Sequence, residues 1–440
     1  MMKTPICDFV RQYAQEAPVR LHMPGHKGEA VLGMEQLDIT EVQGADSLYD
    51  AGGIIRESEE NAGALFGCPT FYSTEGASQC IRAMVYLAVL HAKKQGKAPK
   101  ILAARNVHKT FLGAVALLDV DVRWLYPQED DCYLSCEISP EDLDGILERE
   151  AFTAVYVTSP DYLGQMADIA AISKVCRRHG VLFLVDGAHG AYLKFLEQSL
   201  HPMDLGADLC CTSAHKTLPV LTGGAYLHLA SGQLCDFAKD ALAMFGSTSP
   251  SYLILQSLDA ANPELARLGA QLRQFLPLVE ELKQRLTGAG FTLCGSEPMK
   301  LTIAPKGYGY TGQELAEELL KHNMVCEFFD PDHLVLMLTP QLKEQDLRSL
   351  EQLLCGLEKK PPVQEQPPQF RAAQKVCSVR QAMLSPRVKL PASQSEGRVL
   401  ASPSVGCPPA VPILACGERI DRHAVECFRY YGIETVTVID

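Results

Sequence analysis

The chain has 440 residues, 47% of them hydrophobic, so it is long and apolar enough to form a globular protein with more than one domain. Its formal net charge of −13 offers no basic surface to nucleic acid or to an anionic membrane. The sixteen cysteines are scattered without a CxxC pair, so no metal site is expected. Residues 1–18 do not resemble a secretory signal, and no apolar run is long enough to span a membrane; free thiols then favour the cytoplasm.

Residues 77–230 alternate between helical segments and short apolar runs. The first helix is expected over Ala77–Gln95, a second after the cap Ser139, and a third after Asp168 that ends at Gly180. The apolar runs between and after them are Lys100–Ala104, Asp121–Leu125, Thr153–Thr158, Val181–Val185, Ala207–Cys211 and Gly224–His228. This alternation predicts an α/β fold with a mainly parallel sheet that helices cover on both faces.

The pattern changes after Pro250. A long helix near Glu264–Leu286, a strand at Lys300–Ala304, a helix near Gly312–His322 and strands near Val325–Phe328 and Leu334–Leu338 predict a smaller α+β domain. We therefore divide the chain into an N-terminal arm (1–35), a large domain (36–250), a small domain (251–360), a linker rich in Pro, Gln and Ser (361–394) and a C-terminal domain (395–440).

Polar residues cluster where the predicted strands end. Ligands of such sheets bind at the carboxyl ends of the strands. One run ends in Asp186-Gly187-Ala188-His189 and another in Ser213-Ala214-His215-Lys216, while a third leads into Asn106-Val107-His108-Lys109. The helix at Ala77 is entered through Gly76-Ala77-Ser78.

Together these strand ends predict a site for pyridoxal 5'-phosphate. Lys216 supplies the amine that forms an imine with the cofactor, and Asp186 keeps the ring nitrogen protonated so that the ring can accept electrons. The backbone N–H groups and helix dipole at Gly76–Ser78 suit the phosphate. Ser213 and His215 add donors, and His108 can stack on the flat ring.

These motifs resemble the ornithine/lysine/arginine decarboxylase family of fold type I pyridoxal phosphate enzymes, in a short form without an N-terminal wing domain. The similarity covers nearly the whole chain. It is carried by the motifs above and by the stretches 21–28, 38–41, 248–252, 257–259, 396–398 and 408–412.

The resemblance implies an enzyme of amino-acid and polyamine metabolism that decarboxylates lysine, ornithine or arginine. His108 would stack on the ring, Asp186 would pair with its nitrogen, and Ala188 would pack on its other face. Ser78, Ser213 and His215 would bind the phosphate, and His189 would complete the cofactor site. Thr248 would reach the phosphate of a neighbouring subunit, which implies a homodimer or a larger homo-oligomer.

The chain departs from the family pattern at several positions. Gly187 stands where the family usually has Glu, Ala77 and Ala214 where it has hydroxyl residues, and Asn262 where it has Arg. Asp161 interrupts the usual SPTYYG-like stretch, and Cys407 and Ala410 replace Tyr and Gly. The cofactor motifs are thus kept better than their surroundings.

Two alternatives remain open from sequence alone. The first is an aminotransferase, or another amino-acid lyase, on the same fold. Aminotransferases usually hold the substrate carboxylate with an arginine in the small domain, but no arginine occurs between Arg285 and Arg348, and the run Val335–Leu338 is apolar. The second is an inactive pyridoxal-binding homologue. It would not need Lys216, Asp186 and His108 together.

A basic substrate side chain needs an acidic partner. Asp330, Glu327, Asp46 and Asp161 are the candidates, and the sequence does not rank them.

Overall fold

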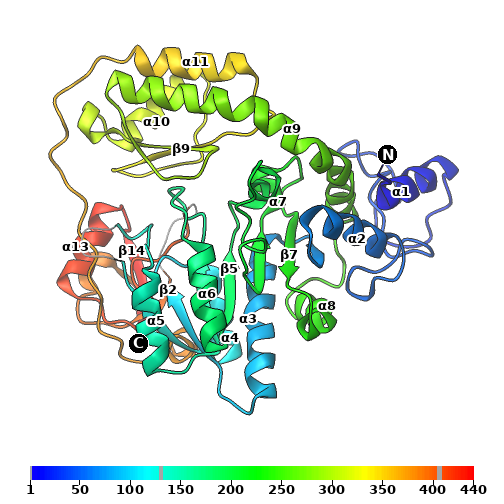
Figure 1. Ribbon diagram of the computed structural model, residues 1–440, viewed down its shortest axis with the longest axis horizontal. Helices are drawn as coiled ribbons and strands as arrows, with labels where there is room; N and C mark the ends of the chain where they lie inside the picture. The colour runs from blue at the N-terminus through cyan, green and yellow to red at the C-terminus, as the bar shows by residue number, and fades with distance from the viewer. Residues whose placement is uncertain (1, 128–131, 404–408) are drawn as a thin grey trace. The chain divides into compact units, whose positions relative to one another are not determined.

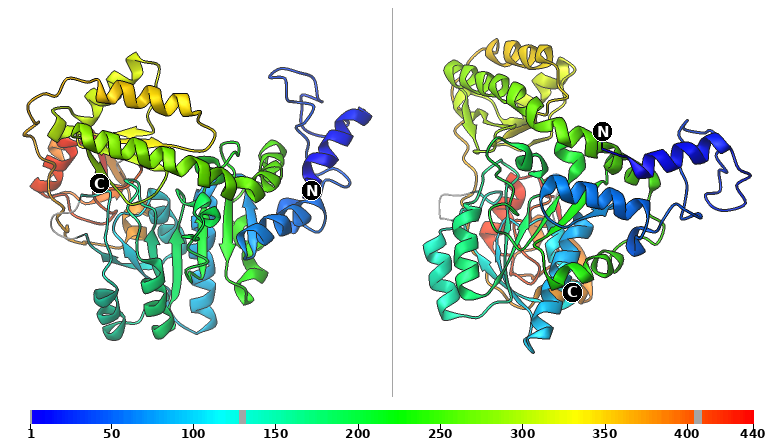
Figure 2. Two further views of the ribbon diagram at one scale, coloured as in Figure 1. Left: turned by 45° about the horizontal axis from the view of Figure 1, so that its top comes forward. Right: turned by 45° about the vertical axis from the view of Figure 1, so that its right-hand side comes forward.

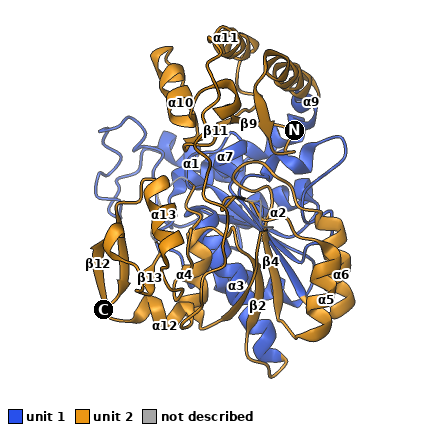
Figure 3. Ribbon diagram, turned by 90° about the vertical axis from the view of Figure 1, so that its left-hand side faces the viewer, with its two compact units in different colours: residues 1–94, 182–272 blue, residues 95–181, 273–440 orange. Residues whose placement is uncertain are grey.

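The computed structural model describes residues 2–127, 132–403 and 409–440 (Figure 1). Cys407 and Pro408, which belong to the family-like C-terminal stretch, lie outside these residues. The chain divides into two compact units, coloured separately in Figure 3. Unit 1 comprises residues 1–94 and 182–272, and unit 2 comprises residues 95–181 and 273–440.

Unit 1 contains four neighbouring strands in the order β1 (Thr70–Ser73), β7 (Ala225–Leu229), β6 (Leu209–Thr212) and β5 (Leu182–Asp186). Strands β5 and β6 are parallel, and β7 is antiparallel to both β6 and β1. Helix α3 (Gly76–Lys94) packs on β6 and β7. The other helices of the unit are α1 (Pro5–Glu16), α2 (Ile54–Phe66), α7 (Ala214–Thr217), α8 (Ala238–Ala243) and the first part of α9 (Tyr252–Ala289).

The α/β pattern of unit 2 begins with three parallel strands. Their order is β4 (Ala154–Thr158), β2 (Lys100–Ala104) and β3 (Asp121–Leu125). Helix α4 (Lys109–Leu118) follows β2, and helices α5 (Pro140–Arg149) and α6 (Ile169–His179) lie side by side (Figure 2). The predicted caps at Ser139 and Gly180 are confirmed: Ser139 accepts a backbone N–H of α5, and Gly180 ends α6 with a φ of 63°. Asp168 also caps α6, by accepting the N–H of Ala171.

The rest of unit 2 forms two antiparallel sheets. The first has the order β10 (Phe328–Phe329), β11 (Leu334–Met337), β9 (Lys300–Ala304) and β8 (Thr292–Cys294), with helices α10 (Gly312–Lys321) and α11 (Glu344–Cys355). The second has the order β12 (Arg387–Pro391), β14 (Thr435–Ile439) and β13 (Leu400–Ser402), with helix α13 (Arg422–Tyr430). The segment 361–394, expected as a linker, also contains helix α12 (Val379–Leu384), and its strand β12 pairs with β14.

The predicted α/β fold class is confirmed, with the smaller α+β part and the C-terminal part that the sequence indicates. The predicted strands agree with the structure to within two residues at each end, apart from Val325–Phe328. There the structure has only the short strand β10 at Phe328–Phe329. None of the helices in the described ranges combines the length and the hydropathy that crossing a membrane requires.

Candidate active site

Asp186 and Lys216 lie at the carboxyl ends of two adjacent parallel strands of unit 1. Asp186 is the last residue of β5, and it lies opposite Cys211 of β6 in the strand register. Lys216 lies in the short helix α7, which directly follows β6. Parallel pairing thus brings both residues to one edge of the sheet, where ligands of α/β proteins bind.

Asp186 is a buried carboxylate, only 2% exposed. Its Oδ1 atom accepts the N–H of Ala188 at 3.2 Å and faces the Sγ atom of Cys211 at 3.6 Å. Burial, and then the charge of Asp186, hold the pKa of the Cys211 thiol well above its ordinary value, so the thiol stays protonated and donates a hydrogen bond to Asp186. A buried carboxylate in this setting suits the protonated nitrogen of a heteroaromatic ring.

The amine of Lys216 lies beside a second residue of the Asp186 loop. Its Nζ atom is 3.0 Å from Nε2 of His189, which is itself buried. The two loops are also joined through their backbones, because Ser213 donates its N–H to the carbonyl of Ala188 at 3.3 Å. The neighbouring Thr217 has a buried Oγ1 atom without a hydrogen-bond partner among the described residues. The Lys216 loop therefore keeps polar capacity that its protein contacts do not use.

A glycine pair joins the lysine loop to the start of α3. Gly223 accepts the N–H of Gly76 at 2.7 Å, and Gly224 accepts both the N–H and the Nδ1 proton of His215, at 3.2 and 3.0 Å. Gly223 has a φ of +101°, and a Cβ atom there would lie 2.9 Å from the carbonyl oxygen of Thr74. The sequence interpretation missed this role, although a Gly-Gly pair before a strand is a turn signal.

The start of α3 presents backbone N–H groups. Gly76 takes a left-handed φ of +71°, and a Cβ atom added there would meet nothing within 4 Å, so the space in front of it is open. Ala77 is buried and Ser78 is half-buried. Because Ala77 lacks the hydroxyl usual in the family, a phosphate here would depend on main-chain N–H groups, the helix dipole and the Ser78 hydroxyl.

These residues of unit 1 fit pyridoxal phosphate by the chemistry of their donors. An amine, a buried carboxylate and a helix N-terminus gather around the ends of β5 and β6. Each matches one part of the cofactor: the aldehyde, the ring nitrogen and the phosphate.

Thr248 lies on an exposed segment that is anchored next to this helix N-terminus. The N–H of Ser247 donates to the carboxylate of Glu75, the residue before Gly76, and both Thr248 and Ser249 are exposed. An exposed threonine on an anchored segment suits the predicted contact with a neighbouring subunit. That contact stays a prediction.

His108 lies in unit 2, at the N-cap of α4. Its Nδ1 atom accepts the N–H of Thr110 at 3.2 Å, which fixes the ring, and its stacking on a cofactor stays a prediction. The segment before it is held by Arg105, which donates to the carbonyl oxygens of Pro412 and Ile413 and forms a buried ion pair with Glu418 at 3.2 Å. The sequence interpretation did not identify this ion pair.

Packing explains two of the departures from the family pattern. A Cβ atom at Gly187 would lie 3.1 Å from Sγ of Cys210 and 3.2 Å from the carbonyl oxygen of Cys211, so a glutamate does not fit without a shift of β6. Asn262 is fully buried and donates to the carbonyl of Ser58 at 3.1 Å and to the hydroxyl of Tyr72 at 3.0 Å. It therefore has a structural role inside unit 1. Ala214 is also fully buried, and nothing in the structure explains its change.

All four acidic candidates accept hydrogen bonds from protein groups. Asp46 accepts five backbone N–H groups at 2.8–3.4 Å, and these bonds outweigh burial and lower its pKa. Asp161 is buried, accepts the hydroxyl of Ser135 and two backbone N–H groups, and has its pKa raised by burial. Glu327 is exposed and accepts the hydroxyl of Tyr162 at 2.9 Å. Asp161 lines one cavity of unit 2, and Asp330 lines another, which is rich in aromatic residues.

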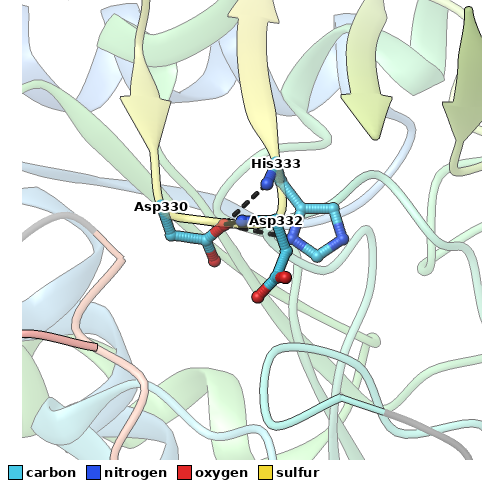
Figure 4. Close-up of side chains that lie close together, drawn as sticks. All are labelled: Asp330, Asp332 and His333. Atoms are coloured by element: carbon cyan, nitrogen blue, oxygen red, sulfur yellow. Dashed lines mark hydrogen bonds and ion pairs between the residues drawn. The ribbon is translucent and has the colours of Figure 1, made fainter. Parts of the chain in front are cut away.

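Asp330 also belongs to a cluster with Asp332 and His333 on the turn between β10 and β11 (Figure 4). One ligand atom from each lies within 4.8 Å of the others. However, Oδ1 of Asp330 accepts the N–H groups of Asp332 and His333, and Oδ1 of Asp332 lies 2.6 Å from the ammonium of Lys306. Protons and a resident cation therefore already occupy these oxygens, and we assign no metal to the cluster.

The chain is similar to known amino-acid decarboxylases. Residues 4–294 match the family model described as "Orn/Lys/Arg decarboxylase, major domain". The chain is 29% identical to an arginine decarboxylase of Bacillus subtilis (strain 168), over 96% of this chain and 92% of the relative. It is 30% identical to an arginine decarboxylase of Halalkalibacterium halodurans, over 95% of this chain and 91% of the relative.

The fold is similar to that of a solved lysine decarboxylase, LdcF of Francisella novicida. The TM-score is 0.81 at 16% identity, over 100% of this chain and 81% of the other. At this identity the likeness supports the fold. The family follows from the sequence match, which spans most of the chain and includes Asp186 and Lys216: the chain belongs to the Orn/Lys/Arg decarboxylase family of pyridoxal phosphate-dependent amino-acid decarboxylases.

Proposed function

We propose that this protein binds pyridoxal phosphate through Lys216 and decarboxylates a basic amino acid, with arginine the first to test. The observation that carries the proposal is the pairing of β5 with β6, which brings the buried carboxylate of Asp186 and the amine of Lys216 to one sheet edge. The relatives named arginine decarboxylases make arginine the first choice; lysine and ornithine remain alternatives.

Different residues of unit 1 have different roles in this reaction. When bound, the cofactor supplies an electron sink for the bond that breaks at the substrate α-carbon. Asp186 holds a proton on the ring nitrogen, because a buried carboxylate favours a positive charge beside it. His189 holds the Lys216 amine in place at 3.0 Å. The N–H groups at the start of α3 hold the phosphate.

We favour loss of carbon dioxide over transamination because this chain lacks the arginine that aminotransferases usually have in their small domain. Strand β11 is apolar and largely buried, and the sequence has no arginine between Arg285 and Arg348. Aminotransferases usually hold the substrate carboxylate near the ring plane with an arginine from this part of the chain. Without it, the carboxylate can stand out of the plane in a poorly solvating site, which is the arrangement that decarboxylation needs.

We also propose a homodimer as the active unit, because Thr248 is exposed on a segment anchored beside Gly76. In this family the corresponding threonine is expected to complete the phosphate site of the neighbouring subunit.

The reaction is tested with purified protein and each basic amino acid in deuterated water. We expect carbon dioxide and an amine that carries one deuterium at the former α-carbon. Borohydride should fix the cofactor to the peptide that contains Lys216, and the Lys216→Ala variant should not be labelled. A keto acid as the only product, or a label on another lysine, would contradict the proposal.

A further inference from the structure

Unit 2 contains a cavity of about 350 Å³ between the β10–β11 turn and the end of α13. Small-molecule sites typically measure about 300–1,000 Å³, so the cavity can hold a small ligand. Of the described residues that line it, five are aromatic, namely Tyr133, Phe328, Phe329, Tyr430 and Tyr431. The faces of such rings carry partial negative charge and attract cations.

Asp330 is the one charged side chain among the described residues that line this cavity. Its side chain is 10% exposed. The Oδ1 atom accepts the N–H groups of Asp332 and His333 at 2.7 and 2.6 Å, whereas no described residue donates a hydrogen bond to Oδ2. One carboxylate oxygen thus fixes the turn, and the other keeps its capacity to accept a donor.

Among the described residues, no lysine or arginine forms an ion pair with Asp330. Lys306 is engaged with Asp332, with the hydroxyl of Tyr430 and with the carbonyl of Glu365. His333 Nδ1 lies 3.4 Å from Oδ1 of Asp330 and forms no hydrogen bond there. Two carboxylates and one ammonium leave one negative charge on this turn when His333 is neutral.

Burial, then Asp332 and then Asp330 raise the pKa of Tyr431, so the rings facing the carboxylate stay uncharged. A buried carboxylate without a matching cation is costly, and a bound cation would remove that cost.

We propose that this cavity binds an aliphatic ammonium or guanidinium cation, with the charge at Asp330 and the alkyl chain among the aromatic rings. The choice of alkyl cation rests on the proposed function, since a basic amino acid and its amine product share this group. The preference for a cation rests on the cavity alone. The cation could come from the substrate's own side chain or from a separate effector molecule, and the experiment distinguishes the two.

The test compares butylguanidine with butylurea, which has nearly the same shape and no charge. Butylguanidine has no primary amine, so it cannot take the place of the Lys216 amine. Calorimetric titration of the holoenzyme should show butylguanidine binding at least tenfold more tightly than butylurea. Equal affinities for the two compounds, or no binding of butylguanidine, would overturn the proposal without any variant.

Two variants assign the charge. Asp330→Asn keeps the oxygen that caps the turn and removes the charge; it should weaken butylguanidine binding at least tenfold and leave butylurea binding unchanged. Glu327→Gln removes a charge three residues away that does not line the cavity, so it is the matched control and should bind like the wild type. Equal affinities of Asp330→Asn and wild type would refute the assignment.

Steady-state kinetics then identify the source of the cation. Competitive inhibition by butylguanidine, together with a raised KM in Asp330→Asn, would show that the substrate's side chain uses the cavity. Noncompetitive effects with an unchanged KM would show a separate effector site. If no basic amino acid is decarboxylated, the proposed function fails, while the calorimetry still decides the cation site.

Discussion

Nε2 of His189 lies 3.0 Å from Nζ of Lys216, and these two residues come from loops that follow adjacent strands. This contact fixes where the lysine amine points. His189 is therefore a positioning residue for the amine, and its removal should slow the chemistry while leaving substrate binding largely unchanged.

We predict that His189→Asn lowers kcat tenfold to a hundredfold, equivalent to about 1.4–2.8 kcal/mol, with KM nearly unchanged. Borohydride fixation at Lys216 should also slow. The matched control is His179→Asn, which breaks a 2.6 Å contact with Asp144 at the end of α6 and should leave both readings unchanged. A His189→Asn enzyme with wild-type kcat would contradict the positioning role.

Gly187 gives a test of packing behind the cofactor site. Gly187→Ala should destabilise the protein by about 1–3 kcal/mol, because the new Cβ atom would press on Sγ of Cys210 and the carbonyl of Cys211. Thermal unfolding should show a lower midpoint. Gly113→Ala on α4 is the control: its Cβ atom meets nothing within 4 Å, so the midpoint should rise or stay level. An unchanged midpoint for Gly187→Ala would show that β6 gives way easily.

The sequence was sufficient to place each cofactor motif at the end of a strand, because each motif follows a strongly apolar run. It located Asp186, Ser213 and Lys216 on the loops that the structure joins through Ala188. It could not find the contact between Gly76 and Gly223, since these residues are far apart in the chain and meet only through antiparallel pairing of β1 with β7. The roles of the predicted site residues remain predictions.

The sequence also could not rank the acidic residues that are candidates to bind a basic substrate side chain. Asp46, Asp161 and Asp330 all stand in polar loops and all accept backbone N–H groups, and the sequence does not show that Asp330 also faces an aromatic cavity. The three residues are distinguished only by which of their carboxylate oxygens accept hydrogen bonds from the protein. The strand predicted at Val325–Phe328 begins too early because Val325, although apolar, is 83% exposed and does not belong to the core.

Two fully buried histidines of unit 1 predict acid lability. Burial is the main cause that lowers the pKa of His201 to about 3; Asp204 opposes this shift and Lys194 adds to it. Burial also holds the pKa of His228 well below its usual range. Both are neutral when folded and take up protons near pH 6.5 when unfolded. The two histidines therefore cost no free energy of unfolding above about pH 6.5. Below that pH the free energy of unfolding falls by up to about 1.4 kcal/mol per pH unit for each histidine.

Urea unfolding at pH 7.5 and pH 5.5 measures this loss. His201→Gln should reduce the difference between the two pH values, because one of the two histidines no longer titrates. His179→Gln, at a partly buried position beside Asp144, is the control and should leave this difference unchanged. If His201→Gln and the wild type lost stability equally, protonation of His201 would not drive the acid lability.

The ion pair between Arg105 and Glu418 should be important for stability. Both side chains are at most 4% exposed, and Glu418 also accepts the N–H of Ala415. Glu418→Gln keeps an acceptor but leaves the Arg105 charge unpaired, so we expect a loss of about 3–5 kcal/mol. Hydrogen exchange should accelerate in residues 409–418. Glu351→Gln breaks the exposed 3.0 Å pair with Arg285 and should cost about 1 kcal/mol or less. Equal losses in the two variants would contradict this ranking.

The N-terminal arm gives the test of the proposed homodimer. Helix α1 and the loop after it project from the strands of unit 1 (Figure 2), and the arm exposes Val19, Leu21, Val31 and Leu32 by 82–92%. The loop is nevertheless ordered by its own contacts: Arg20 donates to the carbonyl oxygens of Gln36 and Asp38 at 2.6 and 3.1 Å. An ordered segment that displays apolar side chains to water is typical of a surface that another chain covers.

We predict that the Leu21→Asp/Leu32→Asp double variant dissociates the dimer, because burying two new carboxylates in an apolar contact is costly. Sedimentation velocity should show a Kd at least tenfold higher than that of the wild type, and activity should fall on dilution. Leu117→Asp, at an exposed apolar position of α4, is the control and should sediment like the wild type.

Mixed Lys216→Ala and Thr248→Ala chains should regain part of the activity, because one of the two sites in a hybrid dimer carries neither lesion. A wild-type protein that sediments as a fully active monomer would rule out the dimer, and a double variant with unchanged Kd would place the contact elsewhere than on the arm.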